Sequence, residues 1–197
     1  MTYGDKAKEN FLNGYTCAQA VLSAFQEEKW FKESGISVET AMKLASSFGG
    51  GMGRLREVCG AVSGMFMAFG LAHGFSAPPE TDDAKADHYK RIQELAALFK
   101  AENGTIVCRE LLGLAPMMQN ASGTNAGDMK AASGNPQNAT GTVSDNSPNG
   151  TVSGDPYAHV PEARTAEYYK KRPCPDLCKC AADILAEYLG LQEQKNA

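Results

Sequence analysis

Apolar residues recur at helical spacing along most of the 197-residue chain. A four-residue repeat over 3–11 predicts a first helix that ends at Asn13-Gly14, where glycine can close the last turn. Thr16 is then a predicted N-cap, and Gln19 three residues later would complete a capping box for a second helix. The same periodicity predicts further helices over 37–48, 58–69, 89–103, 107–112 and 177–188.

The predicted helix over 58–69 is apolar on nearly all sides, so we expect it at the centre of the fold. No segment shows the two-residue alternation of a convincing strand. The short connections favour an all-α fold, an irregular bundle of about six to seven helices.

One segment breaks this pattern. From about 118 to 156 the chain has no Leu, Ile, Phe, Trp or Tyr and is rich in Asn, Gly, Ser and Thr. Such a segment buries too little apolar surface to offset the entropy lost on ordering it. Only about 40 residues follow it, too few for a second core. The sequence therefore predicts a single helical domain over 1–197 that is interrupted by a long, disordered insertion.

The charge balance argues against some classes of partner. Charged residues make up 21% of the chain, and the net charge is −4. This gives no electrostatic reason to expect binding to nucleic acid or to an anionic membrane. No run reaches the roughly 18 apolar residues of a membrane span. The first residues, Met1 to Lys6, lack the apolar core of a signal peptide, so we expect a cytoplasmic protein.

The chain contains six cysteines. Structural disulfides are disfavoured in a reducing cytosol, so metal or cluster ligation, catalysis and redox exchange are the favoured uses. The alternative is that several cysteines are small buried hydrophobic residues. That alternative suits an isolated cysteine better than a set whose positions share a pattern.

Four cysteines lie at or near predicted helix starts: Cys17, Cys59, Cys108 and Cys174. A helix start offers unpaired N–H groups and a partial positive charge. These lower the pKa of a thiol and favour the thiolate, which attacks disulfides and ligates metals. Arginines within three residues of three of these cysteines add positive potential: Arg56, Arg109 and Arg172.

Glycines shape the surroundings of Cys59. Gly60 and Gly64 are one helical turn apart and leave a patch without side chains beside it. We predict that this patch admits either another helix or a bulky inorganic cluster. The glycine-rich loop over 49–53 lacks the spacing of a dinucleotide loop and follows a helix, so no nucleotide site is expected.

Cys178 and Cys180 are predicted accessories, either spare ligands, resolving thiols or residues without a role at the site. The chain has no C-x-x-C pair, which argues against a thioredoxin-like site and a zinc ribbon, and no C-x-x-C-H, which argues against covalent haem. No metal-ligand spacing includes His73, His88 or His159, which we expect at the surface or at helix ends.

The ordered set of motifs resembles the C-GCAxxG-C-C family of redox-active proteins. The motifs are YTCAQAV (15–21), FGGGMG (48–53), CGAVSG (59–64), CRELLG (108–113) and RPC (172–174). The resemblance covers essentially the whole chain except the polar insertion. It implies that Cys17, Cys59, Cys108 and Cys174 are the signature cysteines. The domain also resembles part of split-Soret cytochrome c, which suggests iron–sulfur binding.

Three interpretations of the four-cysteine set stay open. In the first, the cysteines converge and ligate an iron–sulfur cluster for electron transfer. In the second, two of them cycle between dithiol and disulfide without metal. In the third, they hold a structural zinc ion. No feature indicates a substrate or a reaction class beyond redox chemistry. We expect a redox partner protein of unknown identity, and the sequence leaves a homo-oligomer open.

Overall fold

The computed structural model describes residues 1–79, 81–114 and 159–191. The described residues form helices and no strands, which confirms the predicted all-α class. All of them belong to one compact unit, made of Met1–Ala115 and Asp155–Ala197. The insertion predicted at about 118–156 lies outside the described residues. The helices are α1 (Tyr3–Leu12), α2 (Cys17–Ala24), α3 (Lys29–Glu33), α4 (Val38–Ser46), α5 (Gly49–Met52), α6 (Gly60–His73), α7 (Asp82–Asn103), α8 (Cys108–Leu111), α9 (Ala166–Lys171) and α10 (Cys174–Tyr188).

Threonine caps begin the first two helices. At α1, Thr2 Oγ1 accepts a hydrogen bond from the Asp5 backbone N–H at 3.0 Å, and the Asp5 carboxylate accepts one from Thr2 N. At α2, Thr16 and Gln19 form the predicted capping box, in which Gln19 Oε1 accepts from Thr16 N at 3.0 Å. Both boxes satisfy N–H groups that a helix start leaves without partners.

Three short helices are absent from the sequence prediction. These are α3, α5 and α9, which have 5, 4 and 6 residues. Segments of this length make fewer than two turns, so they show no repeating apolar stripe. The longer predicted helices all occur, with ends within a few residues of their expected positions, apart from α7, which begins at Asp82.

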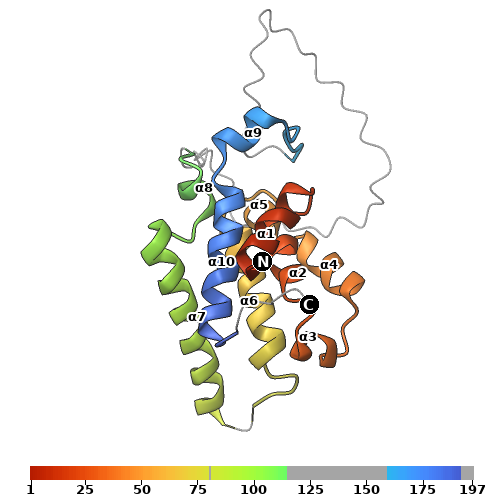
Figure 1. Ribbon diagram of the computed structural model, residues 1–197. Helices are drawn as coiled ribbons and strands as arrows, with labels where there is room; N and C mark the ends of the chain where they lie inside the picture. Colours follow the sequence, from red (N-terminus) through yellow and green to blue (C-terminus); the bar gives the residue numbers. More distant parts are fainter. Residues whose placement is uncertain (80, 115–158, 192–197) are drawn as a thin grey trace, which may run out of the picture. The chain divides into compact units, whose positions relative to one another are not determined.

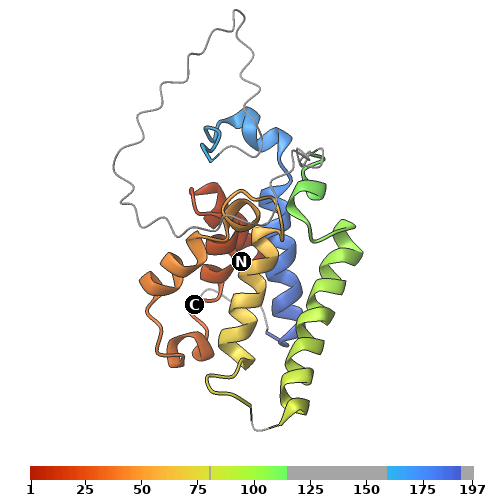
Figure 2. The same cartoon turned by 180° about the vertical axis from the view of Figure 1, so that it is seen from behind.

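The longer helices pack around α6. Helices α2, α6 and α10 contact one another, α1 packs on α2 and α10, and α7 packs on α6 and α10. The two views show α6 and α10 side by side, with α7 along α10 (Figure 1 and Figure 2). Both α6 and α10 begin at the end of the bundle where α5 and α8 lie (Figure 1). This arrangement brings several helix starts together.

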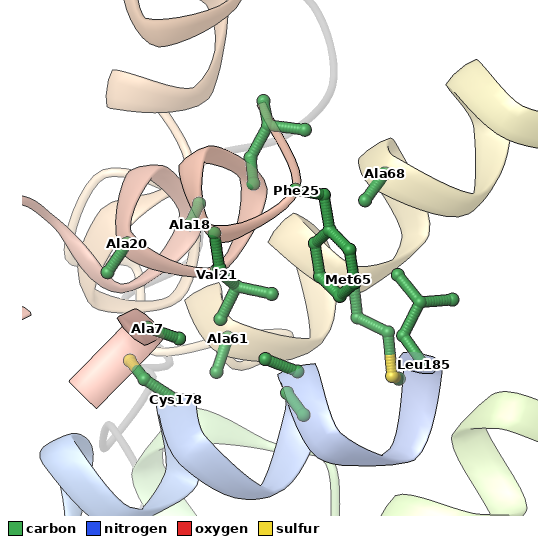
Figure 3. Packing of buried hydrophobic residues seen from close by; sticks show 14 of the residues in the cluster. Ala7, Ala18, Ala20, Val21, Phe25, Ala61, Met65, Ala68, Cys178 and Leu185 are labelled. Carbon is green, nitrogen blue, oxygen red and sulfur yellow. The ribbon is translucent and has the colours of Figure 1, made fainter. Parts of the chain in front are cut away.

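The hydrophobic core lies between these helices, away from the end where α5 and α8 lie. Its largest fully buried side chains include Phe25, Phe69 and Leu185. Figure 3 shows labelled side chains of α2, α6 and α10 pointing toward one another, among them Val21 and Met65. Most residues of α6 are buried, which confirms its predicted central position. Among the described residues, no helix combines the length and apolar character needed to cross a membrane.

Candidate thiol site

Four cysteines lie at the starts of four helices. Cys17, Cys108 and Cys174 are the first residues of α2, α8 and α10, and Cys59 is the N-cap of α6. At α10, Pro173 is the N-cap and a second proline follows Cys174, where the missing N–H costs nothing. The local sequence thus fixes where each thiol enters its helix.

An isolated β-bridge joins the segments that carry Cys59 and Cys108. The bridge pairs Val58 with Val107 in antiparallel fashion. Cys59 N donates to the Ile106 carbonyl at 2.8 Å, and Cys108 N donates to the Glu57 carbonyl at 2.6 Å. Each cysteine directly follows one residue of the bridged pair, and the two side chains interact electrostatically. The bridge therefore brings together two cysteines from different helices.

Glycines let the surrounding backbone come close to the thiols. A Cβ placed on Gly60 would lie 3.0 Å from Cys17 Cβ, and one on Gly51 would lie 2.6 Å from Cys108 Cβ. A Cβ on Gly64 would lie 2.5 Å from the Ala18 carbonyl oxygen. Of the two neighbours expected for the Gly60 and Gly64 patch, it is a helix, α2, that lies against it.

The four cysteines line one cavity of about 310 Å³, called here the thiol cavity. Cys59 and Cys108 are buried in its wall, with 4% and 6% of their surface exposed. Cys17 and Cys174 are partly exposed. The volume is at the lower end of the roughly 300–1,000 Å³ that small-molecule sites occupy. The cavity can therefore admit a small ligand to the two partly exposed thiols.

Three thiols form a hydrogen-bonded chain at one side of this cavity. The Cys17 side chain interacts by hydrogen bonding with both Cys174 and Cys178. Cys178 Sγ lies 3.8 Å from the Cys17 carbonyl oxygen. Cys178 is fully buried, so it lies behind Cys17 with respect to solvent.

The two predicted accessory cysteines have different surroundings. Cys178 belongs to the thiol chain just described. Cys180 is two residues further along α10, which turns its side chain to another face. There its sulfur lies 3.2 Å from Asn103 Nδ2, on α7. Cys180 does not line the thiol cavity.

The pKa values of the thiols differ from the expectation for helix starts. Burial raises the pKa of Cys59 to about 12, although the N–H groups of Ala61 and Val62 act to lower it. The hydrogen bond to Cys17, followed by burial, raises the pKa of Cys174. The hydrogen bond from Cys174 lowers the pKa of Cys17, but its bond to Cys178 and its burial outweigh this, and the net pKa is raised.

The prediction that the helix starts lower the pKa of these thiols and stabilise their thiolates is therefore wrong. At Cys59 the N–H groups of the helix start lower the pKa, as predicted. Burial raises it by more, because removing a thiolate from water costs more free energy than two hydrogen bonds from N–H groups supply. Burial likewise raises the pKa of Cys108, against the lowering effect of the Arg56 guanidinium, which hydrogen-bonds to it. At neutral pH these thiols are protonated.

Arginines surround the thiol cavity. The lining contains Arg54, Arg56, Arg164 and Arg172. Two of the three arginines noted in the sequence, Arg56 and Arg172, are among them. The third, Arg109, forms an ion pair with Glu57 at 2.8 Å and does not line the cavity.

The loop that carries two of these arginines has an unusual backbone. Three residues other than glycine have a left-handed conformation: Met52 with φ 60°, Arg54 with φ 70° and Arg56 with φ 62°. A side chain in this region costs of order 1–3 kcal/mol where glycine would cost little. The fold thus keeps Arg54 and Arg56 in positions that oppose their backbone preference.

Sequence reasoning missed several residues of the cavity. Arg54 directly follows the glycine-rich loop over 49–53, and no motif marks it. Arg164 lies just before α9 and Tyr168 lies within it, and no motif marks either residue. His159, expected at a surface or helix end, is exposed and lines the cavity. His73 is the exposed last residue of α6, as expected, whereas the expectation for His88 is wrong, because it lies within α7 and is half-buried. Both rings contact Phe69.

Within the described part of the chain, no group of three or more His, Cys, Asp or Glu side chains is placed to hold a metal ion.

Comparison with curated proteins gives no match, and neither does comparison with solved structures. A family model does match, over residues 15–188, under the description "Putative redox-active protein (C_GCAxxG_C_C)". This range covers most of the 197 residues and includes the four cysteines of the thiol cavity. The chain therefore belongs to the C_GCAxxG_C_C family of redox-active proteins.

Proposed function

We propose that the protein exchanges electrons through Cys17 and Cys174, which cycle between a dithiol and a disulfide. The observation that carries this proposal is that these two thiols, from the starts of α2 and α10, line the same cavity, where their side chains interact with each other. Both thiols are also partly exposed and line the same cavity, so a reactant can reach them.

The exchange balances as an ordinary thiol–disulfide reaction. One thiol of the pair loses its proton and its sulfur attacks a disulfide of the reactant, which releases one reactant thiol. The second sulfur then attacks the mixed disulfide and releases the other reactant thiol. The pair loses two electrons and two protons, and the reactant disulfide gains them and becomes two thiols. Because both thiols have a raised pKa, deprotonation limits the rate at neutral pH.

The test is a redox titration with peptide mapping. Reduced protein is equilibrated in buffers of graded potential, free thiols are alkylated, and mass spectrometry locates any bridge. We expect one bridge, between Cys17 and Cys174, that forms and opens reversibly. Cys17→Ser or Cys174→Ser should abolish it, and the matched control Cys180→Ser should keep it. Six free thiols under mild oxidant, or a bridge from Cys17 to Cys178, would contradict the proposal.

A second candidate is an iron–sulfur cluster held by Cys17, Cys59, Cys108 and Cys174. Its support is that four thiols line one cavity beside arginines. Four cysteines are the usual ligand set of [2Fe–2S] and [4Fe–4S] clusters, and such a cluster supplies one-electron transfer. The donor types fit, but the thiols would have to move closer together, because their described positions form no metal-binding group. Nearby guanidinium groups would offset the negative charge of the thiolates.

Anaerobic purification separates the two candidates. Iron and sulfide in stoichiometric amounts, with visible absorption that bleaches on reduction, would replace the dithiol proposal by the cluster. One zinc per chain without redox response would instead indicate a structural metal site. Metal-free protein that forms the Cys17 and Cys174 bridge would support the dithiol proposal.

A further inference from the structure

The thiol cavity is positively charged although the whole chain carries −4. Its lining has four arginines, and Glu162 is the one acidic side chain among the described lining residues. Such a local excess of one charge within a concave site raises the local concentration of ligands of opposite charge.

The protein holds these guanidinium groups in place. Arg164 Nη1 donates to the Phe11 carbonyl at 2.9 Å and to the Tyr15 carbonyl at 3.0 Å. Arg172 pairs with Glu162, and its guanidinium lies 5.3 Å from the centre of the Tyr168 ring. Fixed donors of this kind lose little conformational entropy when a ligand binds.

Arg54 and Arg56 are placed at different depths. Arg56 is buried, with 3% of its surface exposed, and hydrogen-bonds to Cys108. Arg54 is half-buried, so it can meet both the cavity and solvent. Both residues have the left-handed backbone described above, which costs stability. This cost indicates that the backbone is kept because it places the two side chains at the cavity.

We propose that the thiol cavity binds a small anion through Arg54 and its neighbouring arginines, and that the redox substrate is a small disulfide bearing carboxylates. The second half of this statement rests on the proposed function. The cavity of about 310 Å³ suits a small molecule. A carboxylate accepts paired hydrogen bonds from a guanidinium, so binding there would place the disulfide beside Cys17 and Cys174.

Three disulfides of similar size test the substrate class. These are 3,3′-dithiodipropionate, which is anionic, bis(2-hydroxyethyl) disulfide, which is neutral, and cystamine, which is cationic. Each oxidises the reduced protein, and the rate of bridge formation at Cys17 and Cys174 is measured. We expect the anionic disulfide to react about tenfold faster than the neutral one, with the cationic one slowest and the difference shrinking in high salt.

Unreactive analogues test binding alone. Suberate has the length and charges of dithiodipropionate without the sulfur atoms, and 1,6-hexanediol is the matching neutral compound. We expect suberate to bind in calorimetry and to slow alkylation of Cys17 and Cys174 by neutral iodoacetamide, and we expect hexanediol to do neither.

Two substitutions at Arg54 connect this binding to the cavity. Arg54→Gln removes the charge, and Arg54→Gly removes it while also suiting the left-handed backbone. Both should weaken suberate binding and reduce the preference for the anionic disulfide. The control Lys43→Gln removes one positive charge from α4, outside the cavity lining, and should leave the preference unchanged.

The two proposals fail in different ways. Equal rates for the three disulfides, with no protection by suberate, would overturn the anion site and leave the dithiol function standing. Protection by suberate without oxidation by any of the three would overturn the dithiol function and the substrate class, and would support the anion site.

Discussion

The two halves of α6 are packed by opposite means. At its start, an added carbon on Gly64 would collide with the backbone of α2 at the Ala18 carbonyl oxygen, and one on Gly60 would collide with the Phe48 carbonyl oxygen and Cys17 Cβ. Farther along, Met65 and Phe69 fill space with large side chains that are fully buried. The thiol end of the bundle is therefore sensitive to added volume, whereas the core end is sensitive to lost volume.

The same contrast holds for charge and backbone strain. The thiol end contains buried thiols, arginines and left-handed residues, all of which cost stability. The core end contains aromatic contacts such as that of Phe69 with Tyr188, with ring centres 6.0 Å apart. This difference indicates that the core end stabilises a site that would not be stable alone.

The largest expected effect comes from the core end. Phe69→Ala removes a fully buried ring and should lower the free energy of unfolding by about 3–5 kcal/mol. Urea denaturation followed by circular dichroism measures this. The exposed control Leu44→Ala, at a side chain with 60% exposure, should change stability by less than about 0.5 kcal/mol. Similar losses from both variants would contradict the described core.

The second largest expected effect is a loss of stability at high pH, which arises from Cys59 at the thiol end. The pKa of Cys59 is about 12 in the folded protein, above its ordinary value of 9.0. The unfolded chain therefore loses this proton first. The stabilisation is complete below pH 9 and is lost as the pH rises to about 12, at about 1.4 kcal/mol per pH unit.

Urea titrations at several pH values between 9 and 12 measure that slope. Cys59→Ala removes the titrating thiol, so its unfolding free energy should decline less steeply than that of the unaltered protein. An identical slope in both proteins would show that Cys59 is not the buried group responsible.

Two glycines of α6 should respond to the same substitution in opposite directions, and both effects on stability are smaller than those above. Gly64→Ala places a carbon 2.5 Å from the Ala18 carbonyl oxygen and should cost about 1–3 kcal/mol. Gly70→Ala has nothing within 4 Å and should gain up to about 1 kcal/mol from better helix propensity. Thermal unfolding of the two variants checks the comparison, which fails if both shift in the same direction.

The smallest expected effect is at Arg54. Arg54→Gly relieves a left-handed backbone with φ 70° and should raise the free energy of unfolding by up to about 1 kcal/mol. The same variant should react less selectively with anionic disulfides. A loss of stability in chemical denaturation would show that the Arg54 side chain contributes more to folding than its backbone costs.

Sequence patterns were sufficient for the long helices. The capping box of Thr16 and Gln19 and the apolar stripe of α6 are local signals, and the structure contains both. The positions of Cys17, Cys59, Cys108 and Cys174 at helix starts followed from the same signals. Such patterns work because each depends on residues within a few turns of one another.

Other features depend on contacts between distant segments. The bridge of Val58 with Val107 has no periodic signal, because it pairs single residues. The raised thiol pKa values depend on burial among several helices, which a helix-start argument cannot include. Helical spacing places Cys178 on the face of Cys174 and Cys180 on another face, but only the packing of α1, α2 and α7 around α10 shows what each of them contacts.

The contact between Cys17 and Cys174 also has a consequence for protein synthesis. A ribosome makes Cys17 before its partner, which lies on the last described helix, α10. During most of translation the emerging chain presents Cys17 without the thiol that completes the pair. A chain that stops before α10 can never form it. The proposed pair can therefore form only in molecules whose synthesis has passed that helix, and a bridge between the two thiols would report that the two distant segments have met.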